Sequence, residues 1–308
     1  MSIAFVFKGL REKAFLLYGG NGSSQLMEVV MTGFIVSEIW QYPIKGCAGE
    51  SLKYAPVSKR GFNYDRRWMV VDENGMFVTQ RGQGSSGIGV RSICLVRAKI
   101  RKRFCVVTAP GMTELIFPTM AHSFATCDVQ VWDWRGIGIE VSRTCSDWFT
   151  EYLSRERPGT YRLVQIAEHV PRRAKTGTSH MSFGDGFPFL VTSEASLAEV
   201  NSRIQGDPVS MNRFRPNIVI SGCEAHAEDR MDHVFIGNVF LRGQKLCERC
   251  AVPATIQETG GMDSRPLAAL ATYRRWKDDE GKMKVWFGRN FNHRGTGVIH
   301  RGSVLEVL

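Results

Sequence analysis

The feature that most limits the fold of this 308-residue chain is how soon its apolar segments are broken by Gly, Asn, Asp or Pro. Short segments rich in β-branched and aromatic residues between such breaks are typical of strands joined by turns. Residues 34–42 end in this way at Pro43. Residues 68–71 and 76–79 flank an Asn-Gly pair, which predicts a hairpin. Further strands are expected within residues 93–107, 129–141 and 304–308.

Helical patterns are fewer. Ser146 is a suitable N-cap for a helix over residues 146–153, and residues 193–204 carry apolar side chains at helical spacing. Pro266 opens a third candidate that runs to about residue 276. Because strands and helices do not alternate strictly, we expect a β-rich α+β fold built from barrels, and not a parallel doubly wound sheet.

The segment 171–186 is rich in Arg, Lys, Gly, Ser and Thr, and it predicts a boundary between two parts. The N-terminal part then covers residues 33–170 and the C-terminal part residues 171–308. Residues 1–32 have no steady period and are interpreted as an N-terminal extension without a function. They form either a loose tail or a segment upstream of a natural start at Met31.

Composition excludes several classes of protein. No apolar run reaches the roughly 18 residues of a membrane-spanning helix, and no secretory cleavage site follows the first apolar runs. Eight cysteines are too sparse for a disulfide scaffold, so a reducing, cytoplasmic location is expected. The net charge of +10 suits an anionic ligand or an acidic partner. The basic residues are judged to be scattered, without a run or a stripe, so binding of nucleic acid gains little support.

The pair Cys247 and Cys250 is the first candidate for chemistry. A Cys-x-x-Cys can be half of a zinc site, a redox pair or two thiols in the core. No second such pair follows, and Pro253 disfavours the helix that a thioredoxin-like motif would open. Of these interpretations of the Cys pair, two thiols packed in the core is given about half the weight, because short motifs give many false positives. The remaining interpretation is a single thiolate ligand for a soft metal.

Two further segments carry candidate binding residues. Arg215, fixed by the Pro that follows it, could grip a phosphate or carboxylate, and Asn217 could add a hydrogen bond. A loop Arg paired with a nearby acid is the simpler alternative. Lys45 beside Gly46, and Arg66 at the start of the hairpin, offer positive charge, but each alone is better explained as an exposed residue at a strand edge.

Taken together, the motifs resemble the MOSC family (the molybdenum cofactor sulfurase C-terminal domain), preceded by its N-terminal β-barrel unit. Within that family the likeness is greatest to the amidoxime-reducing subgroup, over residues 33–308. The motifs that carry it are residues 42–52 (YPIKGCAGESL), 189–197 (FLVTSEASL), 214–217 (FRPN) and 247–250 (CERC).

The resemblance implies a pterin-based molybdenum cofactor with one protein thiolate on the metal. Cys250 falls on that ligand position, and the remaining matched positions line the cofactor. Two departures occur: Gly46 stands where many relatives carry Ser, and Gly186-Phe187 replaces a hydroxyl pair. The matched cofactor-binding residues are Lys45, Gly46, Arg66, Arg215, Asn217, Arg249 and Asn290.

The implied function is the reduction of N-hydroxylated compounds, such as hydroxylamines, amidoximes and N-hydroxylated nucleobases. The protein positions the cofactor that carries the chemistry. No ferredoxin-type Cys-x4-Cys-x2-Cys run is present, so the electron donor is expected to be a separate ferredoxin, flavoprotein reductase or cytochrome. Two alternatives stay open: a non-catalytic carrier of the cofactor or its sulfur, and a basic barrel that binds nucleic acid. The physiological substrate and the oligomeric state are not predicted.

Overall fold

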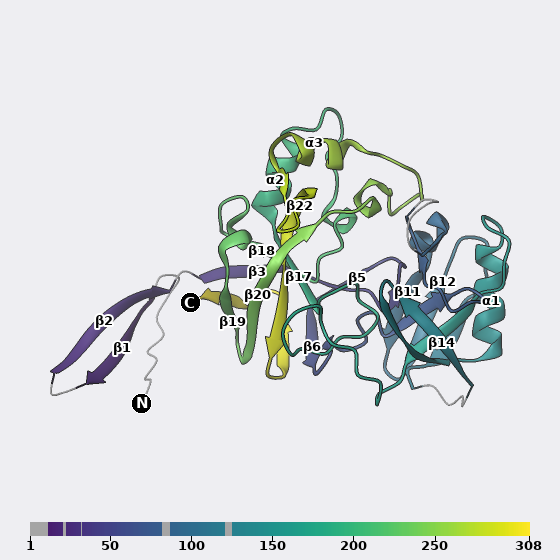
Figure 1. The fold of residues 1–308 in the computed structure, drawn as a ribbon, viewed down its shortest axis with the longest axis horizontal. Helices are drawn as coiled ribbons and strands as arrows, with labels where there is room; N and C mark the ends of the chain where they lie inside the picture. The colour runs from purple at the N-terminus through teal and green to yellow at the C-terminus, as the bar shows by residue number, and fades with distance from the viewer. Residues whose placement is uncertain (1–11, 21–22, 32, 82–86, 121–124) are drawn as a thin grey trace.

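A computed structural model describes residues 12–20, 23–31, 33–81, 87–120 and 125–308. Its main element is a closed barrel of seven strands, in the middle of Figure 1. Antiparallel pairing of the last strand in the order, β22, with the first, β17, closes the ring. The expected β-rich α+β fold with a barrel is therefore confirmed. The order is β17 (Phe189–Ser193), β18 (Ile218–Ser221), β3 (Gly33–Gln41), β24 (Val304–Val307), β19 (His233–Ile236), β20 (Val239–Glu248) and β22 (Met283–Arg294).

The barrel is assembled from both ends of the chain, because β3 lies between β18 and β24 and pairs with each of them antiparallel. Successive residues of a strand face opposite sides, and β18 shows the consequence. Ile218 and Ile220 join the core that contains Val36. Val219 instead packs in a second cluster with residues of the two covering helices, α2 (Glu194–Asn201) and α3 (Arg265–Tyr273). The division expected at residue 171 stays a prediction. β3 precedes it in the sequence but belongs to the barrel, whose other strands all follow it.

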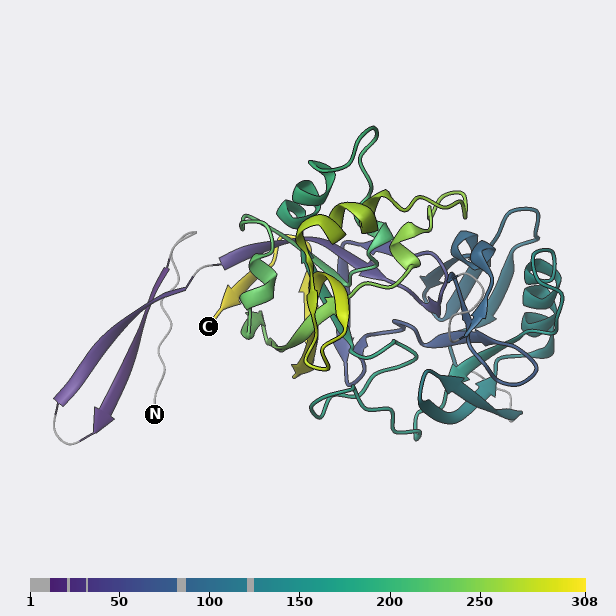
Figure 2. The same ribbon diagram turned by 45° about the horizontal axis from the view of Figure 1, so that its top comes forward.

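The N-terminal part forms a second β-rich unit. Its core lies between a five-stranded sheet, a three-stranded sheet and helix α1 (Arg143–Leu153), with Trp68, Phe117 and Phe149 fully or almost fully buried. Figures 1 and 2 both show α1 on the side away from the barrel. The five-stranded order is β14 (Thr126–Val131), β15 (Trp134–Glu140), β16 (Arg162–Ile166), β8 (Trp68–Val71) and β4 (Ile44–Lys45), and the three-stranded order is β11 (Arg97–Arg101), β12 (Phe104–Thr108) and β13 (Leu115–Pro118).

The remaining elements are short. β23 (Gly297–His300), β6 (Tyr54–Ser58) and β7 (Gly61–Phe62) form a small sheet, while β9 (Val78–Thr79) pairs with β10 (Ile88–Gly89), β5 (Glu50–Leu52) with β3, and β21 (Arg275–Lys277) with β22. Single turns of 3₁₀ helix are η1 (Arg91–Leu95), η2 (Met211–Arg213), η3 (Ala227–Arg230) and η4 (Val252–Ala254). β1 (Glu12–Gly20) and β2 (Ser23–Met31) pair as an antiparallel hairpin, which differs from the loose tail expected there. Residues 1–11, 21–22 and 32 lie outside the described residues.

The turn expected at the Asn-Gly pair is present. Gly75 N donates to Asp72 O at 3.1 Å, and the Asp72 carboxylate accepts from the backbone N–H groups of Asn74 and Met76. The antiparallel pairing beyond it is limited to a single bridge between Val71 and Phe77, because β9 turns away to pair parallel with β10. Strands were expected within residues 93–107 and 129–141. The structure has a hairpin at each place, β11–β12 and β14–β15, and the first is preceded by η1.

Two helix boundaries differ from expectation. The N-cap of α1 is Ser142, whose Oγ accepts from Cys145 N, so the assignment of Ser146 as the cap is wrong. Ser146 is buried in the helix and donates to Glu140. α3 ends at Tyr273, and Trp276 already belongs to β21. In the described residues, no helix is both long and apolar enough to span a membrane.

The Ser142 cap gives a first prediction. Ser142→Ala should lower the free energy of unfolding in urea by about 1 kcal/mol, because one N–H at the start of α1 loses its acceptor. Ser142→Asp should restore most of it, since a carboxylate also caps a helix N-terminus. Ser146→Asp should not be tolerated in the same way, because the new charge would lie buried beside Glu140. Equal tolerance of both Asp variants would contradict the assignment of Ser142.

Candidate functional site

A cavity of about 360 Å³ lies where the barrel meets the N-terminal sheets. It forms there because the chain leaves the barrel at the end of β3 and joins the five-stranded sheet at β4. The structure brings all of the site residues expected from the sequence to this one cavity, although their roles stay predictions. The expected residues that line it are Lys45, Gly46, Arg66, Arg215, Asn217, Arg249, Cys250 and Asn290.

Two of the expected arginines share one aromatic ring. The guanidinium carbons of Arg66 and Arg215 lie 4.2 and 4.3 Å from the ring centroid of Tyr42. Both arginines have a positive φ, 47° and 56°, which costs a non-glycine residue on the order of 1–3 kcal/mol. The alternative of an acid partner for Arg215 is not realised among the described residues, where its side chain donates to Gln257 at 3.5 Å. Burial lowers the pKa of Arg215, so a bound anion would stabilise its charge.

The side chain of Asn217 forms hydrogen bonds with three other residues of the protein. Its side-chain oxygen accepts from Leu190 N at 3.2 Å and from Arg66 at 3.3 Å, and its amide nitrogen donates to Trp40 O at 3.4 Å. With 2% exposure, Asn217 therefore supports Arg66 and joins the start of β17 to β3. Its contribution to a ligand is through the orientation of Arg66.

Lys45 is 7% exposed and lies in the cavity wall, unlike the exposed edge residue that was the alternative. It forms an ion pair with Asp185, which also accepts from the indole N–H of Trp132 at 3.0 Å. Burial lowers the pKa of Lys45 to about 8, although Asp185 opposes this shift. Burial acts to raise the pKa of Asp185, but the charge and hydrogen bond of Lys45 outweigh it and hold that pKa below its usual value.

Several lining residues were not identified from the sequence. Asp185 lies in the segment interpreted only as a boundary, and Arg81 packs its guanidinium 4.2 Å from the Trp132 ring. The charge of the cavity wall is strongly positive, since cationic side chains far outnumber carboxylates. Its cationic residues are Lys45, Arg66, Arg81, Lys175, Arg215, Lys245 and Arg249, and its acidic residues are Asp185 and Glu248.

The two candidate cysteines differ in their contacts. Cys247 and Cys250 are both free, half-buried and part of the lining. Arg249 donates to the Cys247 sulfur at 3.1 Å, whereas the Cys250 sulfur has no hydrogen-bond partner among the described residues. The described residues contain no group of three His, Cys, Asp or Glu side chains arranged to hold a metal ion. Of the cysteines outside this cavity, Cys47, Cys94, Cys105 and Cys145 are buried, and Cys127 and Cys223 are half-buried.

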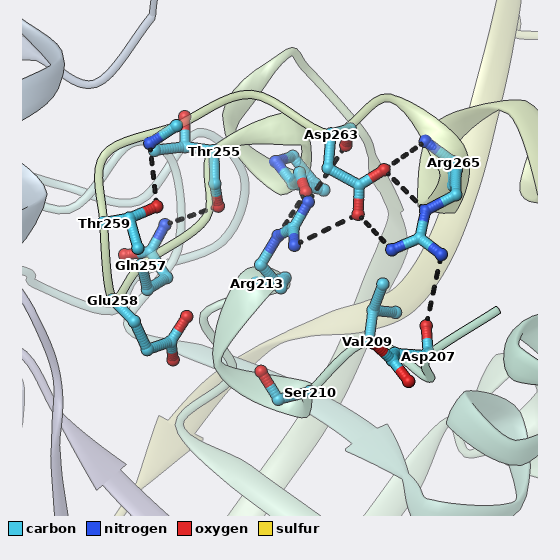
Figure 3. A network of polar contacts seen from close by, with 12 residues as sticks. Asp207, Val209, Ser210, Arg213, Thr255, Gln257, Glu258, Thr259, Asp263 and Arg265 are labelled. Carbon is cyan, nitrogen blue, oxygen red and sulfur yellow. Dashed lines mark hydrogen bonds and ion pairs between the residues drawn. The ribbon is translucent and has the colours of Figure 1, made fainter.

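The loop after Cys250 is fastened at two points. Arg213 donates through Nε to Pro253 O at 2.8 Å and through Nη2 to Asp263 O at 2.9 Å, as Figure 3 shows. On the other side, the amide of Gln257 donates to Gln80 at 2.8 Å, which connects the loop to the N-terminal part. The position of Cys250 therefore depends on a buried arginine that does not line the cavity.

The cavity should bind anions with a defined pH dependence. In ligand-free protein, the affinity for sulfate should fall as pH rises through about 8, by at most tenfold per pH unit, because Lys45 loses its proton above its free-state pKa. Sulfate keeps its charge over this range. A difference in affinity between about pH 7 and about pH 9, measured by titration calorimetry, therefore comes from titration of the protein. In Lys45→Arg the dependence should disappear, since Arg stays charged. An unchanged slope in that variant would assign the titration to another group.

Arg213 should control the order of the Cys250 loop. Arg213→Lys cannot reproduce both backbone hydrogen bonds, and it should lower the free energy of unfolding by about 1–3 kcal/mol. Hydrogen exchange of the amides at 252–263 should accelerate in the same variant. Arg265→Lys is the matched control, because Arg265 bonds the same Asp263 from an exposed position. This variant should change the free energy of unfolding and the exchange rates of the loop only slightly. Similar exchange rates in both variants would show that Arg213 does not hold the loop.

Two protein-family models match the chain: the MOSC N-terminal beta barrel domain over residues 33–156 and the MOSC domain over residues 178–306. Mitochondrial amidoxime reducing component 2 of Bos taurus is 34% identical over 87% of this chain and 81% of the relative. The same component of Rattus norvegicus is 33% identical over 78% and 72%. Mitochondrial amidoxime-reducing component 1 of Homo sapiens is 31% identical over 89% and 82%. The chain therefore belongs to the MOSC-domain family, with the MOSC N-terminal β-barrel domain, in its amidoxime-reducing component subgroup.

Proposed function

We propose that this protein is a molybdenum-cofactor-dependent oxidoreductase that reduces N-hydroxylated compounds with electrons from a separate donor protein. The observation that carries the proposal is the cavity that brings Cys250 together with Lys45, Arg66 and Arg215. These residues are distant in the sequence and come from both the N-terminal and the C-terminal part of the chain, yet each matches a cofactor position of the family. The names of the relatives, amidoxime-reducing components, support the class of substrate.

The residues of the cavity fit such a cofactor. Its phosphate is an anion, and guanidinium groups are suited to hold phosphate by paired hydrogen bonds. The Nε atoms of Arg81 and Arg249 are buried in the wall without a hydrogen-bond partner among the described residues. Buried donors of this kind are expected to have a partner, and a polar ligand would supply it. Cys250 adds a half-buried sulfur that has no hydrogen-bond partner in the part of the chain that the structure describes, and sulfur is the type of ligand that a soft metal prefers.

In this proposal Lys45, Arg66 and Arg215 hold the phosphate end, and Cys250 is the single protein ligand of the metal. Gly46, Arg249 and Asn290 line the remaining surface, and Asn217 keeps Arg66 in place. The Asn290 amide already donates to the backbone at Lys245 and Leu246, at 3.4 Å each, which leaves its oxygen toward the ligand's hydrogen-bond donors. Because glycine has no side chain, Gly46 can adopt the positive φ of 84° at which the chain turns here.

The bound cofactor would supply the two-electron chemistry that cleaves an N–O bond. The overall reaction takes up two electrons and two protons, converts the N–OH group to N–H and releases water. The chain binds, orients and encloses the substrate, and the aromatic walls formed by Phe77, Trp132 and Phe187 favour planar compounds. A ferredoxin, flavoprotein reductase or cytochrome would provide the electrons. A cytoplasmic location stays a prediction, and the relatives are named as mitochondrial proteins.

Replacing Cys250 tests the proposal. Protein made in a host that synthesises the cofactor should contain molybdenum and pterin and should reduce an aromatic amidoxime with an artificial electron donor. Cys250→Ala should lose the metal and at least a hundredfold of the turnover, because the metal loses its only protein ligand. Cys247→Ser is the matched control, since it changes a neighbouring sulfur in the same cavity, and it should retain the metal.

The outcomes separate the alternatives. Wild-type protein without molybdenum or pterin would overturn the proposal. Bound cofactor without turnover of any N-hydroxylated compound would favour a carrier of the cofactor or its sulfur. Full activity in Cys250→Ala would leave the family assignment in place and exclude Cys250 as the metal ligand.

A further inference from the structure

The outer face of the three-stranded sheet is exposed and carries two kinds of side chain. Its inner face is buried against α1 through Ala98, Cys105, Val107, Leu115 and Phe117. The register places alternate residues of the three strands side by side on the opposite face. These outward residues are Arg97, Lys99 and Arg101 on β11, Phe104, Val106 and Thr108 on β12, and Ile116 and Pro118 on β13.

The basic residues of this face form a run, which the sequence analysis did not identify. Five of the seven residues at 97–103 are Arg or Lys, and none is acidic. Among the described residues, Arg101 alone of these five forms an ion pair, with Glu50 at 3.1 Å. Strand alternation turns Arg97, Lys99 and Arg101 to one side, and the β11–β12 turn adds Lys102 and Arg103 at the same end as Phe104. The judgement that the basic residues are scattered is therefore wrong for this segment.

The apolar residues of the face are unusually exposed. Phe104 is 47% exposed, Ile116 is 55% exposed, and Met120, just beyond β13, is 73% exposed. Phe104 is directly opposite Pro118, and Thr119 N donates to Arg103 O, so Met120 follows closely on the β11–β12 turn. One end of the sheet thus presents Phe, Pro and Met beside a cluster of positive charges.

We propose that this face, called here the basic–apolar face, attaches the protein peripherally to a membrane surface that contains anionic lipids. In this arrangement the Lys and Arg side chains contact the lipid headgroups, while Phe104, Ile116 and Met120 enter the interface between headgroups and acyl chains. Basic side chains beside exposed apolar ones are the combination that interfacial attachment requires. The attachment is independent of the proposed enzymatic function.

Size and composition favour a lipid surface over a macromolecular partner. Three strands about 4.8 Å apart and about five residues long present on the order of 200 Å², well below the roughly 800 Å² that a stable protein interface buries on each partner. A single-stranded nucleic acid would need several aromatic side chains for base stacking, and Phe104 is the one aromatic residue on the face. Isolated aliphatic side chains and mobile positive charges suit fluid lipids.

Vesicle co-sedimentation tests the proposal with the full chain. The protein should bind phosphatidylcholine vesicles that contain about 30% phosphatidylserine, and binding to phosphatidylcholine alone should be much weaker. Arg97→Gln with Lys99→Gln should weaken binding about 25-fold, since each basic residue at an anionic surface contributes about fivefold. Phe104→Ser with Ile116→Ser should weaken the binding that remains at high salt. Amidoxime reduction should be unchanged in both double variants.

A matched control lies on the neighbouring sheet, where Arg135 and the 42% exposed Ile137 also face solvent on β15. Arg135→Gln with Ile137→Ser should leave vesicle binding unchanged. No binding to anionic vesicles, or equal losses in the control and in the variants of the basic–apolar face, would overturn the proposal. Binding of an oligonucleotide or of an acidic protein that is lost in the face variants, while vesicle binding persists, would assign the face to that partner instead.

Discussion

The site depends on one buried ring. Tyr42 follows the last residue of β3, and it is the point at which the chain passes from the barrel to the N-terminal sheets. Its hydroxyl donates to Pro216 O at 3.0 Å, and its backbone N–H donates to the Asp65 carboxylate at 2.9 Å. Both cationic arms of the cavity, Arg66 and Arg215, pack on this ring. One side chain therefore sets the relative position of two residues that belong to different parts of the fold.

The chemistry of Tyr42 suits that task. Burial raises the pKa of its phenol, and the opposing influence of the two arginines does not reverse the shift, so the hydroxyl stays a neutral donor. The one carboxylate that forms an ion pair here among the described residues, Asp65, pairs with Arg66 at 2.6 Å and leaves Arg215 unpaired, whereas a carboxylate in place of the ring would neutralise Arg215 as well. An aromatic ring attracts both guanidinium groups without cancelling their charge. Packing offsets the cost of the two strained backbones, Asp65 offsets part of the repulsion between the two arginines, and an anionic ligand would offset more of that repulsion.

Much of the fold and of the site could be predicted from the sequence, and the limits have physical causes. Residue types and turn signals predict strands because they act locally, as at the turn before Gly75. The closed barrel depends on pairings between distant segments, β22 with β17 and β3 with β18 and β24, which no local pattern records. The basic run at 97–103 was not recognised in the sequence, because its first charged residues alternate with Ala98 and Ile100. The register of β11 and β12 then places Arg97, Lys99 and Arg101 on one face.

Some site residues could be recognised in the sequence, and others could be recognised only in the folded structure. Cys250 and Arg215 lie in motifs that the family resemblance identifies as binding residues, whereas Asp185, Arg81 and Trp132 come from irregular segments that contribute to the cavity only after folding. Ser142 was missed as a cap because several polar residues precede α1, and burial of Ser146 decides between them. The family resemblance therefore identifies the proposed binding residues, and tertiary structure identifies the residues that orient them.

The conformation of Gly46 bears on how the proposed anion would be held. Its φ of 84° lies in the left-handed region, and a Cβ at this position would come within 3.3 Å of Val78 O and 3.2 Å of Ile93. A serine here would need both the strained backbone and a shift of those neighbours, so the hydroxyl found in many relatives is not easily added. In the proposed site, the binding of a phosphate would then depend on Lys45 and the arginines. Because such ionic contacts weaken as salt screens them, whereas a neutral hydroxyl's hydrogen bond does so much less, anion binding in this cavity should be more sensitive to salt than in a serine-containing relative.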